Sequence, residues 1–327
     1  MAKVSVLMAV YNAAAWLHDS IGSLQRQTMG DWQLLCVDDG STDNSLAILR
    51  ELQRQDERIT VVVLAENGGQ AHARNVGLRQ ATGDYVCFLD ADDTLSADAL
   101  QRAVTVFEQH EATDCVLFQV MNVREDGASE AYPMECFTAL SGREAFLLSL
   151  DWQIHGVYMV RASLHRQYPY DETCRAYSDD NTTRLHYYNA REVRCCTGIY
   201  YYYARTSSVT HQVSVRRFDH LRANESMKRQ LLEIGASPDV LAIYEQQRWL
   251  VVVDCYMFYH VHGRRLTAAE RHYALSELRR VWASIDRTLL NKRTTAKFGY
   301  RPCRYWTLFR AQEWLYFTLR GLCGKNR

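Results

Sequence analysis

The sequence lacks several features that would place it in a specialised class of protein. It has no apolar run of about 20 residues, so we expect nothing in it to span a bilayer. Its ten cysteines include the adjacent pair Cys195-Cys196 but no Cys-x-x-Cys spacing. This pattern fits neither a disulfide framework nor a zinc site, and we expect the cysteines to be reduced and mostly buried. It also has no internal repeat and no low-complexity segment.

An excess of either charge is absent too. Lys+Arg and Asp+Glu both number 38, so the net charge of zero implies no polyelectrolyte partner. No recognised nucleic-acid-binding module is present, and we expect no nucleic acid to bind. The charge is nevertheless uneven, because the chain from residue 291 onward has nine basic residues and one acid. That segment carries 9 − 1 = +8, and the first 290 residues therefore carry −8.

What is present is an ordinary globular composition. The 327 residues are 47% hydrophobic and 23% charged, which is enough for a sizeable core and for one large or two smaller domains. Near the start, Lys3 precedes the apolar run Val4–Val10, and Ala13-Ala14-Ala15 follows. A short signal peptide would have this order, but the run of about seven residues is at the lower limit for one. We interpret it as a first core strand and expect a cytoplasmic protein.

The first 115 residues alternate between apolar runs and helical spacing. Apolar, strand-like runs cover residues 4–10, 32–37, 59–64 and 85–89, and each of the three intervals between them contains a stretch with helical spacing. This order predicts a mostly parallel sheet with helices on both faces. Later in the chain the pattern predicts strands over 115–121 and 152–160, and helices over 142–150, 221–234, 240–259 and 267–290.

The stretch GDYVCFLDADD, residues 83–93, carries the clearest chemical signal. An apolar strand ends directly before Asp90, Asp92 and Asp93, and ligands of open α/β sheets bind beyond the carboxyl ends of the strands. Carboxylates so close together repel one another unless a cation or solvent neutralises them. Their oxygens are ligands that suit Mg²⁺ or Mn²⁺. The alternative is a solvated turn in which Asp93 or Thr94 caps the next helix.

Five sequence blocks in order resemble one enzyme family. They read VSVLMAVYNAAAWLHDSIGSLQRQT, VDDGSTDNS, ENGGQAHARNVGLRQATGDYVCFLDADD, YSDDNTTRLHYYNA and YYYARTSSVT, and cover about residues 3 to 210. Together they resemble a family 2 glycosyltransferase of the GT-A fold, as found in bacterial polysaccharide and lipopolysaccharide synthesis. The resemblance implies an α/β, Rossmann-like fold that transfers a sugar from a nucleotide donor.

The resemblance also implies roles for residues at the nucleotide edge of the sheet. Asp92 would be the principal metal ligand, and Asp90 would face the metal or the donor ribose, while Asp93 could substitute for either. Asp39 would accept the uracil N3–H with Tyr11 stacking on the base, so a uridine nucleotide is expected. Asp38 and Asp39 could instead form the turn and cap with Gly40 and Ser41. Arg74 would help to hold the nucleotide, or would be a helix-surface arginine.

The same resemblance suggests the residues of the acceptor side. Asp180 in SDDN would be the catalytic base, and a single displacement would invert the anomeric centre. This block departs from the family pattern, since Asp179 replaces a glutamate and Thr183 an aromatic residue. The alternative is a helix N-terminus that carries these acids for the macrodipole. Arg205 and Ser208 could close over the diphosphate, and His211 could be a third metal ligand.

The segment 291–327 combines its positive charge with many aromatic and apolar residues. A basic segment rich in Trp and Phe is typical of one that lies on an anionic membrane surface, and the alternative is a C-terminal helix packed on the domain. We therefore expect a catalytic domain over 1–215, with a nucleotide-sugar-binding half over 1–115 and an acceptor half over 116–215. A helical region over 216–290 and this tail would follow.

These observations lead to one hypothesis and two alternatives. The hypothesis is an inverting, metal-dependent transferase that moves a sugar from a UDP-sugar to a hydroxyl of a growing bacterial surface glycan, such as O-antigen, capsule or lipooligosaccharide. The acceptor would be linked to a lipid diphosphate, and the enzyme would sit peripherally on the cytoplasmic face of the inner membrane. The alternatives are a sugar nucleotidyltransferase and a non-catalytic nucleotide-sugar-binding or membrane scaffold protein.

Overall fold

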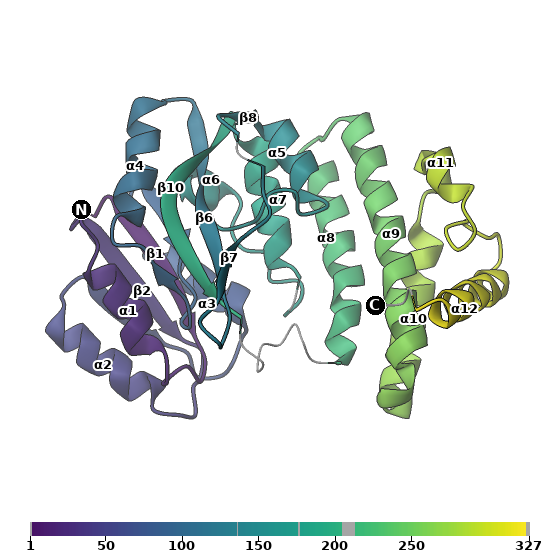
Figure 1. The fold of residues 1–327 in the computed structure, drawn as a ribbon, viewed down its shortest axis with the longest axis horizontal. Helices are drawn as coiled ribbons and strands as arrows, with labels where there is room; N and C mark the ends of the chain where they lie inside the picture. The colour runs from purple at the N-terminus through teal and green to yellow at the C-terminus, as the bar shows by residue number, and fades with distance from the viewer. Residues whose placement is uncertain (1, 136, 176, 205–212, 325–327) are drawn as a thin grey trace. The chain divides into compact units, whose positions relative to one another are not determined.

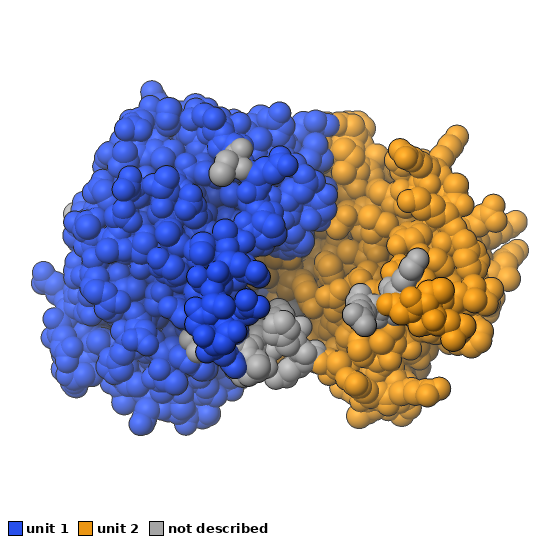
Figure 2. Space-filling view, in the orientation of Figure 1, with its two compact units in different colours: residues 1–172, 182–209 blue, residues 173–181, 210–327 orange. Residues whose placement is uncertain are grey.

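The protein is described by a computed structural model that covers residues 2–135, 137–175, 177–204 and 213–324. Its chain divides into two compact units, coloured separately in Figure 2. The first unit comprises Met1–Glu172 and Thr182–Val209, and the second comprises Thr173–Asn181 and Thr210–Arg327. The first is built on a sheet and the second is made of helices (Figure 1).

Four parallel strands in the order β3-β2-β1-β4 form one half of the sheet (Figure 1). These strands are β1 (Val4–Val10), β2 (Trp32–Asp38), β3 (Ile59–Val63) and β4 (Tyr85–Phe88). β1, β2 and β4 are buried almost throughout, as strands covered on both faces must be. The predicted α/β fold is confirmed.

The other half of the sheet is mixed. β9 (Tyr158–Arg161) runs antiparallel to both β4 and β6 (Thr113–Val123), and β10 (Glu192–Tyr203) runs parallel to β6. Short strands β5 (Thr94–Leu95), β7 (Ser129–Ala131) and β8 (Leu140–Ser141) pair at its margins. The strand predicted over 152–160 is wrong before Tyr158. Trp152 has φ 63°, a left-handed conformation that interrupts extended backbone.

Helices of the first unit cover the sheet and carry the loops at its edge. They are α1 (Leu17–Gln25), α2 (Ser45–Gln55), α3 (Gln70–Leu78), α4 (Ala99–Gln109), α5 (Gly142–Ser149), α6 (Ala162–Gln167) and, from Thr182 on, α7 (Asp179–Asn189). Gly77 brings α3 close to the sheet, because a Cβ there would lie 3.3 Å from Leu7 Cδ2. The helix after β4 begins at Ala99 with Asp98 as its N-cap, so the suggestion that Asp93 or Thr94 caps it is wrong.

The second unit is a helical layer with its own apolar core. It contains α8 (Asp219–Glu233), α9 (Pro238–His262), α10 (Ala268–Ser284), α11 (Lys292–Thr295) and α12 (Trp306–Leu322). The helix predicted over 267–290 ends earlier, at Ser284. The next backbone N–H groups are taken by side chains, since Asp286 N–H donates to Glu245 and Thr288 N–H donates to Asp286.

The C-terminal helix α12 packs on α9 within this unit (Figure 1). Phe309 and Phe317 are buried in the common core, where the Phe309 ring lies 5.5 Å from that of Trp249. The segment predicted as a basic, aromatic tail therefore contains a folded helix, and one face of that helix is buried in the core of the second unit. Among the helices that the structure describes, none is both long and apolar enough to cross a membrane.

Glu313 is an acid on the buried face of α12. Gln312 Nε2 donates to its Oε1 at 2.9 Å, while Oε2 has no hydrogen-bond partner among the described residues. Burial raises the pKa of this carboxyl from 4.5 to about 8. The folded state therefore favours the neutral acid at neutral pH.

This burial gives a prediction for stability. Because the folded-state pKa lies above the unfolded-state value, the protonated carboxyl is compatible with folding below pH 4.5, and stability is lost as pH rises toward 8. Glu313→Gln should abolish this loss and raise the free energy of unfolding above pH 8 by a few kcal/mol, at about 1.4 kcal/mol per pKa unit. Urea unfolding across this pH range measures it. Glu233→Gln, at an exposed position, is the control, and a gain that does not change with pH would contradict the prediction.

Candidate active site

Several polar side chains follow the parallel strands where these strands end. Tyr11 comes after β1, Asp39 after β2, and Asp90 two residues after β4. In the register of the sheet, Val10 pairs with Asp38 and Leu7 pairs with Phe88, so the three exit loops leave the same edge. At such an edge a parallel sheet binds its ligands.

Asp39 ties two of these loops together. Its side chain is 2% exposed, and its two carboxylate oxygens accept hydrogen bonds from Gly68 N–H at 2.7 Å and Gly69 N–H at 2.8 Å. These glycines immediately precede α3, whose first N–H groups have no partner inside the helix. Gly40 has φ 73°, and a Cβ there would lie 3.1 Å from the backbone nitrogen of Asn67. The sequence Asp39-Gly40 therefore allows the close approach of the two loops.

Arg74 lies beneath the loop that follows β4. It is 3% exposed, so the alternative of a helix-surface arginine is wrong. Its Nη2 donates to Asp90 Oδ1 at 2.5 Å, and Gln70 Nε2 donates to the same oxygen at 3.0 Å. The guanidinium carbon lies 4.1 Å from the centre of the Phe88 ring. Both α3 and β4 thus fix the carboxylate of Asp90.

Asp93 differs from its two neighbours because its carboxylate is turned into the protein. It is 1% exposed, and it accepts hydrogen bonds from the Tyr200 hydroxyl at 2.8 Å and from Tyr203 N–H at 2.9 Å. The Tyr200 hydroxyl also accepts Asp90 N–H at 3.1 Å. Burial, followed by the negative charges of Asp90 and Asp92, raises the pKa of Asp93 to about 8. Because burial and neighbouring charges favour the neutral form of the Asp93 carboxyl, which is a poor metal ligand, Asp93 is poorly suited to substitute for Asp90 or Asp92.

Tyr200 is the residue that sequence reasoning missed at this site. It is fully buried in β10, 107 residues after Asp93. Alternation along β10 gives no clear signal, because Tyr200 and Tyr202 lie on the same face of the strand and yet Tyr200 is buried while Tyr202 is exposed. The pattern does not indicate which aspartate the buried hydroxyl meets.

Two carboxylates and one aromatic ring remain accessible at the edge. The Asp90 side chain is 27% exposed, Asp92 is half-buried, and Tyr11 is 52% exposed. Carboxylate oxygens that reach solvent next to a strand end are suitable ligands for Mg²⁺ or Mn²⁺. The residues present therefore fit such an ion in chemical type.

The predicted acceptor-side residues are described only in part. Asp180 is half-buried in the first turn of α7 and belongs to the second unit together with Asp179. The helix macrodipole favours acids at this position, so the structure agrees with the alternative that Asp180 belongs to a helix N-terminus. This position does not conflict with a role as the catalytic base, which stays a prediction. Arg205, Ser208 and His211 lie outside the described residues.

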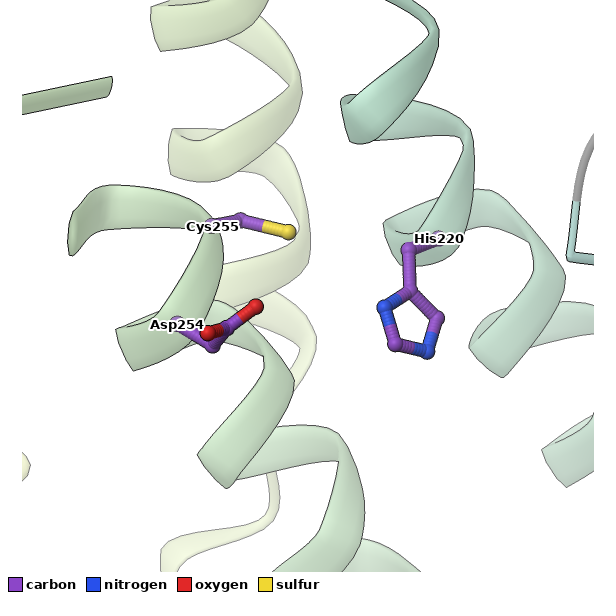
Figure 3. Close-up of side chains that lie close together, drawn as sticks. All are labelled: His220, Asp254 and Cys255. Atoms are coloured by element: carbon purple, nitrogen blue, oxygen red, sulfur yellow. The ribbon is translucent and has the colours of Figure 1, made fainter. Parts of the chain in front are cut away.

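A second cluster of polar side chains lies in the helical unit. His220, Asp254 and Cys255 point toward one another, with ligand atoms within 4.8 Å (Figure 3). Arg217 Nη2 donates to Asp254 at 2.5 Å, so a guanidinium already supplies the positive charge that a cation would bring. Burial also raises the pKa of the Cys255 thiol, which disfavours the thiolate that a metal binds. We interpret the cluster as a half-buried ion pair between Arg217 and Asp254, with His220 and the buried Cys255 as neighbours.

Comparison with protein families gives a match over half of the chain. The model described as glycosyl transferase family 2 matches residues 5–168. An uncharacterized glycosyltransferase of Haemophilus influenzae is 38% identical over 34% of this chain. The putative teichuronic acid biosynthesis glycosyltransferase TuaG of Bacillus subtilis is 44% identical over 30%. These alignments span only 44% and 39% of the two relatives, so the chain matches less than half the length of either.

Solved structures resemble the chain over nearly its whole length. Residues 1–349 of S. aureus TarS, in complex with UDP-GlcNAc, give a TM-score of 0.76 at 20% identity, covering 99% of this chain and 92% of that one. The mannosyltransferase PcManGT of Pyrobaculum calidifontis gives a TM-score of 0.55 at 17% identity, covering 99% and 88%. At these identities the likeness establishes the GT-A fold alone. The match over residues 5–168, which is half of the chain, shows that the chain belongs to glycosyl transferase family 2.

Proposed function

We propose that the protein is an inverting, metal-dependent glycosyltransferase that moves a sugar from a UDP-sugar to an acceptor hydroxyl. The observation that carries the proposal is the edge of the sheet, where Asp39, Asp90 and Asp92 gather on loops that α3 holds in place. A chain of glycosyl transferase family 2 with this arrangement has the groups that binding of a nucleotide sugar requires.

In this proposal Asp39 and Tyr11 bind the uracil ring. The two glycine N–H groups orient the Asp39 carboxylate, and each of its oxygens keeps a further lone pair for the uracil N3–H. Tyr11 is exposed and free to stack on the base. The complexes of TarS with UDP-GlcNAc and UDP support a uridine donor, whereas PcManGT was solved with GDP-Man and Mn²⁺.

Asp92 and Asp90 are the proposed ligands of Mn²⁺ or Mg²⁺. Such an ion neutralises the charge that develops on the leaving diphosphate. Arg74 contributes to donor binding by holding Asp90 from below with a buried guanidinium. Arg205 as a donor-binding residue and His211 as a third ligand are proposals that rest on the sequence blocks alone.

Asp180 is the proposed base on the acceptor side. It would take the proton of the acceptor hydroxyl while that oxygen forms a bond to the anomeric carbon and the bond from this carbon to the diphosphate breaks. One displacement of this kind inverts the anomeric centre, so an α-linked donor gives a β-linked product and UDP leaves. No covalent enzyme intermediate is required.

The proposed acceptor is a growing bacterial surface glycan. TuaG and TarS support this setting, since their names refer to teichuronic acid and poly(ribitol phosphate). We propose that residues 1–115 bind the donor, that residues 116–215 form the acceptor half, and that the acceptor is linked to a lipid diphosphate. Residues 216–290 would form a helical region, and the tail 291–327 would hold the enzyme at the cytoplasmic face of the inner membrane.

The donor and the metal are tested without any acceptor. A panel of UDP-, GDP- and dTDP-sugars is incubated with the protein and Mn²⁺, and thermal stability and slow release of the nucleotide are followed. One UDP-sugar should stabilise the protein by about 3 kcal/mol at a hundredfold excess over its dissociation constant.

Variants connect this result to the proposed ligands. Asp92→Asn should lower nucleotide release on the order of 100-fold, which is equivalent to about 2.7 kcal/mol of charge stabilisation. Asp84→Asn, an exposed acid on the amino side of β4, is the matched control and should behave like the wild type. Release of diphosphate from a nucleoside triphosphate and a sugar phosphate would support a nucleotidyltransferase instead, and binding without any turnover would support a scaffold protein.

Tyr200 is proposed as a positioning residue for these ligands. Tyr200→Phe keeps the ring but removes the hydroxyl that bridges Asp93 and the Asp90 amide, leaving buried groups short of a partner. We expect a loss of about 1–3 kcal/mol in unfolding free energy and a higher Mn²⁺ concentration for half-maximal nucleotide release, with partial rescue at saturating Mn²⁺.

The control for Tyr200 is its neighbour in the same strand. Tyr201 points to the other face of the sheet, so Tyr201→Phe should leave the Mn²⁺ dependence unchanged. A purely structural role for Tyr200 would lower stability in Tyr200→Phe without moving the Mn²⁺ dependence, and that result would contradict positioning.

Asp180 is tested with a glycan acceptor. Asp180→Asn should lower the rate of transfer by about 10² to 10⁴-fold, while nucleotide release in the absence of acceptor stays near the wild-type value. Asp179→Asn, the adjacent acid of the same helical turn, serves as the control. Loss of transfer in Asp179→Asn with activity kept in Asp180→Asn would assign the base to Asp179.

A further inference from the structure

Helix α12 has apolar residues on its outward face as well as on its inward one. Phe309 and Phe317 lie in the core, whereas Leu308, Leu315, Leu319 and Leu322 are 56%, 45%, 49% and 81% exposed. At 3.6 residues per turn, these four leucines fall within about 60° of the helix circumference. We call this stripe the outer face of α12. A row of leucines in water is typical of an interaction surface.

Exposed positive charge precedes the outer face in sequence. Five exposed cations lie in α11 and in the segment that leads to α12, namely Lys292, Arg293, Lys297, Arg301 and Arg304. The only acid after residue 290 is Glu313, and it is buried on the opposite side of α12. The surface around the leucines therefore has no negative charge from this segment.

We propose that the outer face of α12 lies on an anionic membrane surface. The leucines would enter the boundary between headgroups and acyl chains, and the cations of the preceding segment would contact lipid phosphates. Trp314 and Tyr305 are 58% and 56% exposed, and aromatic side chains of this type favour the headgroup level. This inference deepens the proposed function, because it names the surface on which a lipid-linked acceptor would be met.

Charge distinguishes this occupant from a second copy of the chain. Pairing two outer faces would bring together two segments of +8 each, and their repulsion opposes a dimer through this surface. Anionic lipid headgroups supply the complementary charge over a broad area. Each basic residue near such a surface adds to the attraction, and salt weakens it.

The test is vesicle binding by the full chain. The protein is floated with vesicles of phosphatidylglycerol and phosphatidylcholine, and with vesicles of phosphatidylcholine alone, at low and at high salt. Binding should require phosphatidylglycerol and decrease with salt. L315S/L319S should lower the partition coefficient at least about tenfold, because two leucines no longer leave water. The matched control is Leu232→Ser, which removes a 54% exposed leucine from α8.

A charge variant tests the second part of the surface. K292Q/R293Q/K297Q should weaken binding and flatten its salt dependence, whereas R50Q/R102Q/R124Q, which removes three exposed arginines of the first unit, should change neither. All of these positions are exposed, so the variants should unfold at the same temperature as the wild type. Equal unfolding temperatures would show that a change in vesicle binding does not result from misfolding.

Two results would overturn the proposal, namely absence of binding to anionic vesicles and binding that L315S/L319S leaves unchanged. If vesicle binding is absent and light scattering shows a dimer that L315S/L319S abolishes, the outer face pairs with a second copy of the chain instead. The proposed transferase is judged separately, because UDP release from a soluble UDP-sugar needs no membrane. L315S/L319S should release UDP at the wild-type rate. If the wild-type protein released no UDP from any UDP-sugar, that result would contradict the proposed transferase and not the membrane surface.

Discussion

The arrangement of the sheet edge depends on one buried hydrogen-bond chain, from Asp93 through the Tyr200 hydroxyl to the Asp90 amide. Three aspartates within four residues repel one another in any loop that leaves them all ionised and close. Here one of them is withdrawn into the protein, where burial raises the pKa of Asp93 to about 8. The loop therefore presents two accessible carboxylates, Asp90 and Asp92, and β10 determines which two they are.

Helix α3 connects this loop to the loop that follows β2. Asp39 holds the N–H groups that precede the helix, and Arg74 in its second turn reaches Asp90. A buried guanidinium is costly without compensation, and here a carboxylate and two aromatic rings surround it, those of Phe88 at 4.1 Å and Tyr170 at 5.4 Å. A shift of α3 would therefore move both loops together, which couples the position of Asp39 to that of Asp90.

The sequence predicted those elements of the fold that depend on the local spacing of apolar residues. The four parallel strands, most helices of both units and the loops that carry Asp39 and Asp90 follow from apolar periodicity, since burial on both faces leaves continuous apolar runs. Tyr200 was missed because its partners lie more than 100 residues away, and no nearby spacing indicates such a contact. The irregular segment before Tyr158 was missed because a left-handed residue such as Trp152 has no signature when it is not glycine.

The overall neutrality of the chain does not oppose attachment to an anionic surface. At physiological salt the Debye length is about 8 Å, so only charges that lie within roughly that distance of the lipid contribute to the attraction. The attraction therefore depends on which part of the chain faces the lipid, since the segment 291–327 carries +8 and the first 290 residues carry −8. The tail attracts the surface at short range, and any part of the acidic remainder that approached the lipid would be repelled. On an anionic surface, a chain with this partition of charge would have a preferred orientation even though its net charge is zero.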